Sequence, residues 1–250
     1  MDNASSARRL VSSLRLSQPP VALSFVDSVP GDVKHQSGSV PAGCRFWQDA
    51  VGETFATSAS DHSLCAIGLY THNLERSQGQ QTDLADALRV FGDLGYVRQE
   101  DVAAIPVLPF QPQYIVYSQL EKSSLTPNVV LLFVKADQTL ILSEATHQVE
   151  NENPPAMGRP ACGLIPQVMI TGRAALSLGC CGARAYLDVL KDDTAIFAVP
   201  GAKLVEYVQR IETLSKANAM LAKFHALRRR DVEAGHAPTI KDSLAALANA

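Results

Sequence analysis

The feature that most constrains this chain is a pair of adjacent thiols inside a glycine-rich segment, L-S-L-G-C-C-G-A-R-A-Y. In it, Cys180 and Cys181 lie between Gly179 and Gly182, and Arg184 follows. Adjacent side chains on an extended strand point to opposite faces, so we expect one thiol to face a site while the other packs. The glycines let the backbone approach a bulky ligand closely, and a nearby guanidinium stabilises a thiolate.

Three further cysteines stand in similar surroundings: Cys44 in P-A-G-C-R, Cys65 in S-L-C-A-I-G and Cys162 in R-P-A-C-G. Free cysteine is among the most buried residue types, so any one of them alone is best interpreted as a small core residue. Glycine, proline and arginine recur beside them, which favours a shared site. Five cysteines, an odd number, fit a metal or reactive-thiol role better than a disulfide framework.

The composition is that of an ordinary soluble globular protein, with 46% hydrophobic and 19% charged residues in a chain of 250. A net charge of −3 argues against nucleic acid as the main partner. No apolar run is long enough to cross a membrane, and the first residues lack the apolar core of a signal peptide. We therefore expect a cytoplasmic protein with neither a nucleic-acid nor a membrane partner.

Residue patterns predict a single α+β domain with a mixed or antiparallel sheet and helices on one face. The four strands expected in the sheet are 21–26, 114–118, 129–134 and 194–199. Helices are expected at 4–16, 82–94, 140–149 and 201–229, with a short one at 240–248. Residues 1–200 form the domain in this interpretation, and 201–250 form a helical extension. The cysteine-bearing turns are expected to gather at one end.

Two of the thiols lie where a helix is expected to begin. Cys44 opens a predicted helical segment, and Pro160 suits the first turn of an apolar helix that starts near Cys162. The positive end of a helix dipole lowers the pKa of a thiol. His62 and His72 flank Cys65; either is a candidate ligand, although a core or surface role is the commoner one for a lone histidine.

Five spaced motifs carry a resemblance to a known family. They are P-P-V-A-L-S-F at 19–25, G-C-R-F-W at 43–47, C-A-I-G at 65–68, R-P-A-C at 159–162 and S-L-G-C-C-G-A-R at 177–184. Together they resemble the prokaryotic proteins grouped as domain of unknown function 169, over residues 14 to 200. The resemblance implies a cytosolic, cysteine-bearing protein common in anaerobic or redox settings, whose activity is unassigned.

The resemblance also implies which thiols matter. Cys44, Cys65, Cys162 and Cys180 match recurrent cysteines of the family, whereas Cys181 falls on a variable position. These four are the expected metal ligands.

The chain has no C-x-x-C pair, and structural zinc sites usually take ligands from close pairs. An iron–sulfur cluster needs only convergent thiolates, so a 4Fe-4S cluster is the expected cofactor, with zinc as the alternative. If only three cysteines bind, the fourth iron is open to substrate as a Lewis acid. Arg45 and Arg184 are then candidates to grip a small anion, with Gly179 and Gly182 allowing close approach, unless both arginines serve structural salt bridges or carbonyl caps.

Two classes of function stay open. The first is an iron–sulfur-dependent redox or lyase-type enzyme acting on a small anionic molecule. The second is a non-catalytic protein that binds or senses a metal or metallo-cofactor, for example zinc. No catalytic base, P-loop, G-x-G-x-x-G or G-x-S-x-G motif is visible, so the catalytic residues and the substrate stay unknown.

The long C-terminal helix predicts self-association. Its apolar stripe advances in three- and four-residue steps, the spacing that lets two helices pack at a shallow angle. If Leu221, Phe224 and Leu227 were exposed, they would form an apolar patch. The alternative is that the stripe lies along the chain's own sheet. We expect a homodimer in which part of this helix packs against the partner.

Overall fold

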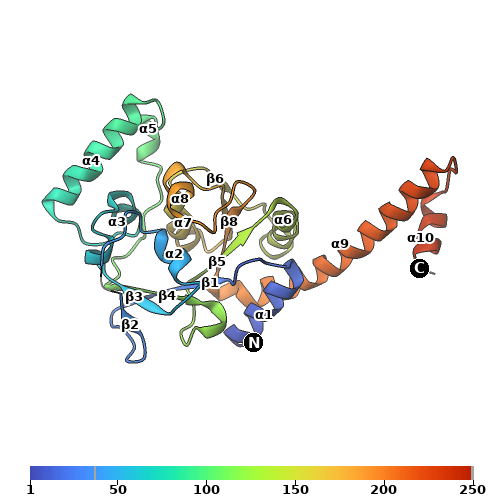
Figure 1. Ribbon diagram of the computed structural model, residues 1–250, viewed down its shortest axis with the longest axis horizontal. Helices are drawn as coiled ribbons and strands as arrows, with labels where there is room; N and C mark the ends of the chain where they lie inside the picture. Colours follow the sequence, from blue (N-terminus) through green and yellow to red (C-terminus); the bar gives the residue numbers. More distant parts are fainter. Residues whose placement is uncertain (37, 249–250) are drawn as a thin grey trace.

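A computed structural model describes residues 1–36 and 38–248 and shows one mixed sheet with helices around it (Figure 1). The eight strands of the described residues run in the order β2-β3-β4-β1-β5-β8-β7-β6. Their bounds are β1 Val21–Val26, β2 Lys34–His35, β3 Phe55–Thr57, β4 Tyr114–Gln119, β5 Val129–Val134, β6 Ala156–Met157, β7 Ala175–Ser177 and β8 Ala195–Pro200. The edge pairs β2–β3 and β6–β7 are parallel, and all other pairs are antiparallel.

Ten α-helices lie in the described part of the chain. They are α1 Asn3–Leu14, α2 Arg45–Asp49, α3 Ala66–Thr71, α4 Gln78–Asp93, α5 Gln99–Val102, α6 Ala136–Glu150, α7 Leu164–Thr171, α8 Cys181–Tyr186, α9 Leu204–Glu233 and α10 Ile240–Ala248. Four 3-10 turns accompany them: η1 Ala59–His62, η2 Leu120–Lys122, η3 Ala161–Gly163 and η4 Gly201–Lys203. The α+β class and the long C-terminal helix are therefore as predicted.

The sheet separates two hydrophobic cores, because alternate side chains of its central strands point to opposite faces. In β5, Val129, Leu131 and Phe133 face a first core that also holds Phe46 and Trp47 of α2. Their neighbours in β5 face a second core, to which α1, α6 and the start of α9 contribute. We use "first core" and "second core" for these two clusters.

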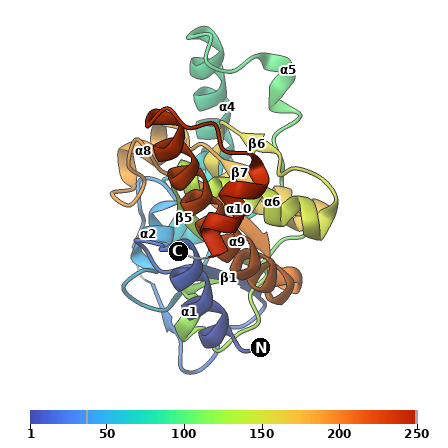
Figure 2. The same ribbon diagram turned by 90° about the vertical axis from the view of Figure 1, so that its right-hand side faces the viewer.

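Helices cover both faces of the sheet, so the expectation of helices on one face was wrong in this detail (Figure 2). The reason lies in β5, whose V-V-L-L-F-V sequence has no polar alternation and whose six residues are all buried. A strand that is apolar on both sides needs a hydrophobic layer on both sides.

The C-terminal helix α9 has two different halves. Its first turns pack in the second core through Leu204, Tyr207, Val208 and Ile211, and its distal half projects from the body (Figure 1). Residues 216–223 are exposed on every side. Beyond them α10 folds back against α9, and Arg228 donates hydrogen bonds to the Pro238 carbonyl and the Ser243 hydroxyl.

This arrangement contradicts part of the prediction that the distal helix exposes an apolar patch. Phe224 is only 6% exposed, and Leu227 is half-buried, because α10 packs back onto the distal half of α9. Leu221 is exposed, as expected, at 53%. No helix within the described ranges is long and apolar enough to cross a membrane.

Candidate functional site

Four thiols lie at the starts of four helical segments on the first-core face of the sheet. Cys44, Cys65 and Cys180 are the N-cap residues of α2, α3 and α8, and Cys162 lies in the 3-10 turn that leads into α7. Cys44 is part of the first core, and the other three pack against it. The structure thus brings together all four cysteines that the sequence singled out, from segments up to 136 residues apart.

Cys65 and Cys180 lie close enough to Cys44 and Cys162 for their charges to affect the pKa of both. Burial raises the pKa of Cys44 to about 12, and charges on Cys65 and Cys180 would add to the rise. Burial also raises the pKa of Cys162 well above its ordinary value; charge on Cys65 adds to this, and a hydrogen bond with Thr71 opposes it. Without a compensating cation these two thiols therefore stay protonated at neutral pH.

The two adjacent thiols diverge. The Cys180 sulfur accepts a hydrogen bond from the Ala183 amide at 3.5 Å, whereas Cys181 is exposed. Interaction with Cys181 is the main cause of a raised pKa at Tyr96, whose ring lies 4.0 Å from the Arg159 guanidinium carbon. Cys181 therefore belongs to a surface group beside the site.

Two glycines give the thiols their space. A Cβ on Gly43 would lie 2.7 Å from His62 Nδ1, and a Cβ on Gly68 would lie 2.8 Å from Cys65 Sγ. Neither glycine has a positive φ, so the requirement comes from packing alone. The sequence shows Gly43 before Cys44 and Gly68 at the end of C-A-I-G. It does not show which side chains lie close to either glycine in the fold. Sequence reasoning therefore missed both glycines.

His62 and His72 are core residues that border the thiols. His62 shares a hydrogen bond with the Thr57 hydroxyl through Nε2 at 3.1 Å, and His72 Nδ1 donates to the Gly68 carbonyl at 3.0 Å. Burial lowers the pKa of His62 to about 3, helped by His72, and burial lowers that of His72 to about 4. Both imidazoles are consequently neutral at pH 7.

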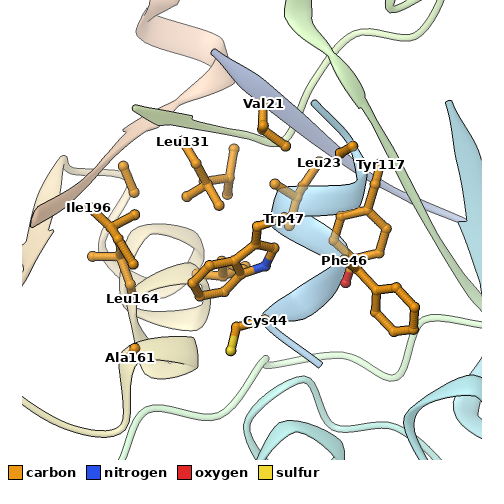
Figure 3. Packing of buried hydrophobic residues seen from close by; sticks show 14 of the residues in the cluster. Val21, Leu23, Cys44, Phe46, Trp47, Tyr117, Leu131, Ala161, Leu164 and Ile196 are labelled. Atoms are coloured by element: carbon orange, nitrogen blue, oxygen red, sulfur yellow. The ribbon is translucent and has the colours of Figure 1, made fainter. Parts of the chain in front are cut away.

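The site is lined by buried polar atoms that have no hydrogen-bond partner among the described residues. They are Trp47 Nε1, Tyr117 Oη, His62 Nδ1 and His72 Nε2. Figure 3 shows Trp47 next to Cys44, with Tyr117 and Phe46 on the same side of the sheet. Polar atoms of this kind are costly in an apolar core unless something accepts or donates to them.

The residues expected to bind an anion have other contacts. Arg184 donates to the carbonyls of Leu178, Lys191 and Thr194, at 2.5, 2.8 and 3.2 Å. Gly179 has a φ of 81°, which favours glycine, and a Cβ there would meet Leu190. Both residues thus hold the loop around α8 in shape, while Gly182 has open space around it.

Arg45 faces a surface hollow between α2 and α8, the helices that begin at Cys44 and Cys180. The hollow has a volume of about 400 Å³ and is also lined by Ser39, Asp49, Tyr186 and Asp188. Arg45 pairs with Asp49 at 3.0 Å, and more loosely with the exposed Asp188 at 3.9 Å.

The spacing of the possible metal ligands can be compared with the spacing that a zinc ion or an iron–sulfur cluster requires. Across residues 1–36 and 38–248, no three His, Cys, Asp or Glu side chains lie close enough to share one metal ion. Thiolates around one zinc ion stand roughly 3.8 Å apart, given Zn–S bonds of about 2.3 Å in a tetrahedron. Thiolates of a cluster bind different iron atoms and therefore stand farther apart. The four thiols share one core with buried N–H and O–H donors, and a cluster does not require them to approach a single ion.

Comparison with known proteins supports one family assignment. The family model for domain of unknown function 169, described as an uncharacterised ArCR, matches residues 9–210. No curated protein and no solved structure matches the chain. The matched region contains all four thiols of the site and ends where α9 leaves the body. The chain thus belongs to the family of domain of unknown function 169, as its motifs indicated.

Proposed function

We propose that Cys44, Cys65, Cys162 and Cys180 hold an iron–sulfur cluster, most simply of the 4Fe-4S type. The observation that carries the proposal is the convergence of four thiols from four separate segments on one side of the sheet. Cysteine thiolates are the usual ligands of such clusters. The exposed Cys181 has no part in the proposed ligand set.

The surroundings of the thiols favour a cluster over a single zinc ion. No three potential ligands in the described ranges are grouped tightly enough for one ion. The raised pKa values of Cys44 and Cys162 mean that their thiolates need strong positive charge nearby, which several iron atoms supply. All five cysteines are free, which suits the reducing cytoplasm that we propose as the protein's compartment.

We further propose that the protein is a redox or lyase-type enzyme acting on a small anionic molecule. A cluster supplies one-electron transfer, or a Lewis-acidic iron where one ligand is released. The hollow between α2 and α8 is the proposed substrate site, because it adjoins the segments that carry Cys44 and Cys180. A carboxylate bound there would compete with Asp188, whose carboxylate lies 3.9 Å from Arg45 and accepts a hydrogen bond from Gln48.

A non-catalytic metal-binding or sensing protein is the second candidate. The closed surroundings of the site favour it, since Cys44 is only 8% exposed and the nearby histidines are buried and neutral. A sensor needs binding without substrate access, whereas an enzyme of either proposed class needs an open route to the cluster.

Anaerobic purification followed by metal and sulfide analysis distinguishes the iron–sulfur cluster proposed for the enzyme from a zinc site. The enzyme proposal expects a brown protein with about four iron and four acid-labile sulfide atoms per chain. A colourless protein with stoichiometric zinc would support the sensing function instead. A protein with neither iron nor zinc would contradict the metal site altogether.

A further inference from the structure

Three side chains of the first-core face carry polar atoms that point to a function beyond packing. Trp47, Tyr117 and His62 are completely buried, and each has a polar atom without a hydrogen-bond partner among the described residues. A buried polar group that lacks a partner destabilises the folded chain. Because all three groups belong to or pack against the core that holds the thiols, we consider them together as part of the site.

Trp47 lies on α2, three residues after Cys44, and its amide donates to the Cys44 carbonyl at 3.0 Å. Figure 3 shows the indole beside the Cys44 side chain. The indole N–H is a donor only, so its partner must be an acceptor. The Cys44 sulfur, which lies beside the indole, is a neighbouring group that accepts a hydrogen bond once it binds metal.

Tyr117 comes from β4 and is held by stacking on Phe55, with ring centroids 5.5 Å apart. Burial raises the pKa of its hydroxyl far above the ordinary value; the nearby Thr57 hydroxyl, which can donate to the phenolate, opposes the rise, while charges on Cys44, Cys65 and Cys162 would add to it. The hydroxyl thus stays protonated and lies within electrostatic range of three of the four thiols.

His62 packs against Phe46 at a centroid distance of 4.8 Å, with Nε2 held by Thr57. Its Nδ1 faces Gly43 and Gly68, the same two glycines that border the Cys65 sulfur. When the Thr57 hydroxyl donates to Nε2, the neutral ring carries its proton on Nδ1 and presents a third donor on the thiol side.

We propose that Trp47, Tyr117 and His62 donate hydrogen bonds to the sulfur atoms of the metal site and thereby raise its reduction potential. The inference rests on the proposed iron–sulfur function and names the residues that tune it. Reduction adds negative charge to the sulfurs, so donors aimed at them stabilise the reduced state more than the oxidised state. The low dielectric of the core strengthens the effect.

Tyr117→Phe tests the proposal, because it removes one hydroxyl and keeps the ring. Tyr207→Phe is the matched control: Tyr207 is equally buried but lies in the second core, near Thr146 and Glu150 rather than the thiols. Redox titration of the anaerobically purified full chain, followed by its visible absorbance, gives the midpoint potential. Iron and sulfide are measured on the same samples.

The expected result for Tyr117→Phe is full iron content with a more negative midpoint potential. A tenfold loss in relative stability of the reduced state corresponds to about 59 mV for a one-electron couple. Trp47→Phe is a second, independent variant with the same expected direction. Tyr207→Phe is expected to keep the potential of the unmodified protein.

Each alternative result has a clear meaning. Unchanged or more positive potentials in iron-loaded Tyr117→Phe and Trp47→Phe would overturn the inference and leave the proposed cluster standing. An equal shift in Tyr207→Phe would also overturn it, because the effect would then not depend on proximity to the thiols. An unmodified protein without iron and sulfide would overturn both this inference and the proposed function.

Discussion

At the scale of single residues, His62 and His72 link the site to the stability of the whole chain. Their pKa values fall to about 3 and about 4 in the folded protein, because both rings are buried. In the unfolded chain a histidine has an ordinary pKa of about 6.5. Between these values the unfolded chain binds more protons than the folded one, so the free energy of unfolding falls as the pH falls.

We predict that lowering the pH from 7 to 5 reduces the free energy of unfolding by about 3 to 4 kcal/mol, since each buried histidine contributes about 1.4 kcal/mol per pH unit below 6.5. The stabilisation is complete above pH 6.5. Urea unfolding at the two pH values measures the difference. In His62→Gln/His72→Gln the pH dependence is expected to flatten; an equally steep dependence in that variant would contradict the assignment.

Gly68 is one of the two glycines beside the thiols at which an added Cβ would be too close to a neighbouring side chain. We predict that Gly68→Ala lowers the free energy of unfolding by about 1–3 kcal/mol, because its Cβ would press on the Cys65 sulfur. Gly182→Ala is the matched control, since nothing lies within 4 Å of its Cβ position and it stands in helix α8. Chemical denaturation measures both. Equal stability of Gly68→Ala and the unmodified protein would show that the site relaxes freely.

At the scale of elements, the strongest sequence patterns predicted the centre of the sheet. The strands expected from 21–26, 114–118, 129–134 and 194–199 are the four adjacent central strands β4, β1, β5 and β8. Their β-branched and apolar runs suffice to mark them. The two-residue edge strands β2 and β6 could not be predicted, because tertiary contacts rather than local preference form them.

The sequence indicated which cysteines lie on the first core, but it did not indicate which residues surround them. Cysteines beside glycine and proline stand out in a sequence, and all four selected by their motifs are neighbours in the fold. Trp47 and Tyr117 look like ordinary core residues until β4 and α2 are seen to meet at the thiols. In the sequence Arg184 looked like an anion ligand. Its carbonyl partners could not be foreseen, because Leu178 comes before α8 and Lys191 and Thr194 come after it.

The Arg184 contacts lead to a prediction at this scale. Arg184→Gln should destabilise the loop around α8 by about 1–2 kcal/mol, because three carbonyls lose a charged donor at a partly solvated position. Thermal and chemical unfolding measure the loss, with Arg89→Gln on the exposed face of α4 as the control. An unchanged stability together with lost substrate binding would return Arg184 to the anion-gripping role.

At the scale of the whole molecule, the distal part of α9 contains a segment that no other part of the described chain covers. Residues 216–223 are exposed all round, and isolated helices of this length are marginal in water. Residues 214–250 carry six Lys or Arg against three Asp or Glu, whereas the rest of the chain carries 16 against 22. A basic arm on an acidic body favours association with a second copy.

We propose a homodimer that covers this segment, and predict a dimer by light scattering at micromolar concentration. Met220→Glu/Leu221→Glu should produce a folded monomer, because it places two charges at the exposed apolar positions of the arm. Leu94→Glu, at a more exposed position after α4, should remain dimeric. An unmodified protein that is monomeric under these conditions would contradict the proposal.

The central claim is that four specific thiols hold one iron–sulfur cluster. The most direct measurement is the iron and acid-labile sulfide content of Cys44→Ser, Cys65→Ser, Cys162→Ser and Cys180→Ser, purified without oxygen beside Cys181→Ser. We predict that each of the four loses most of its iron and sulfide, whereas Cys181→Ser retains the content of the unmodified protein. Full iron and sulfide in all four variants, or an equal loss in Cys181→Ser, would contradict the claim.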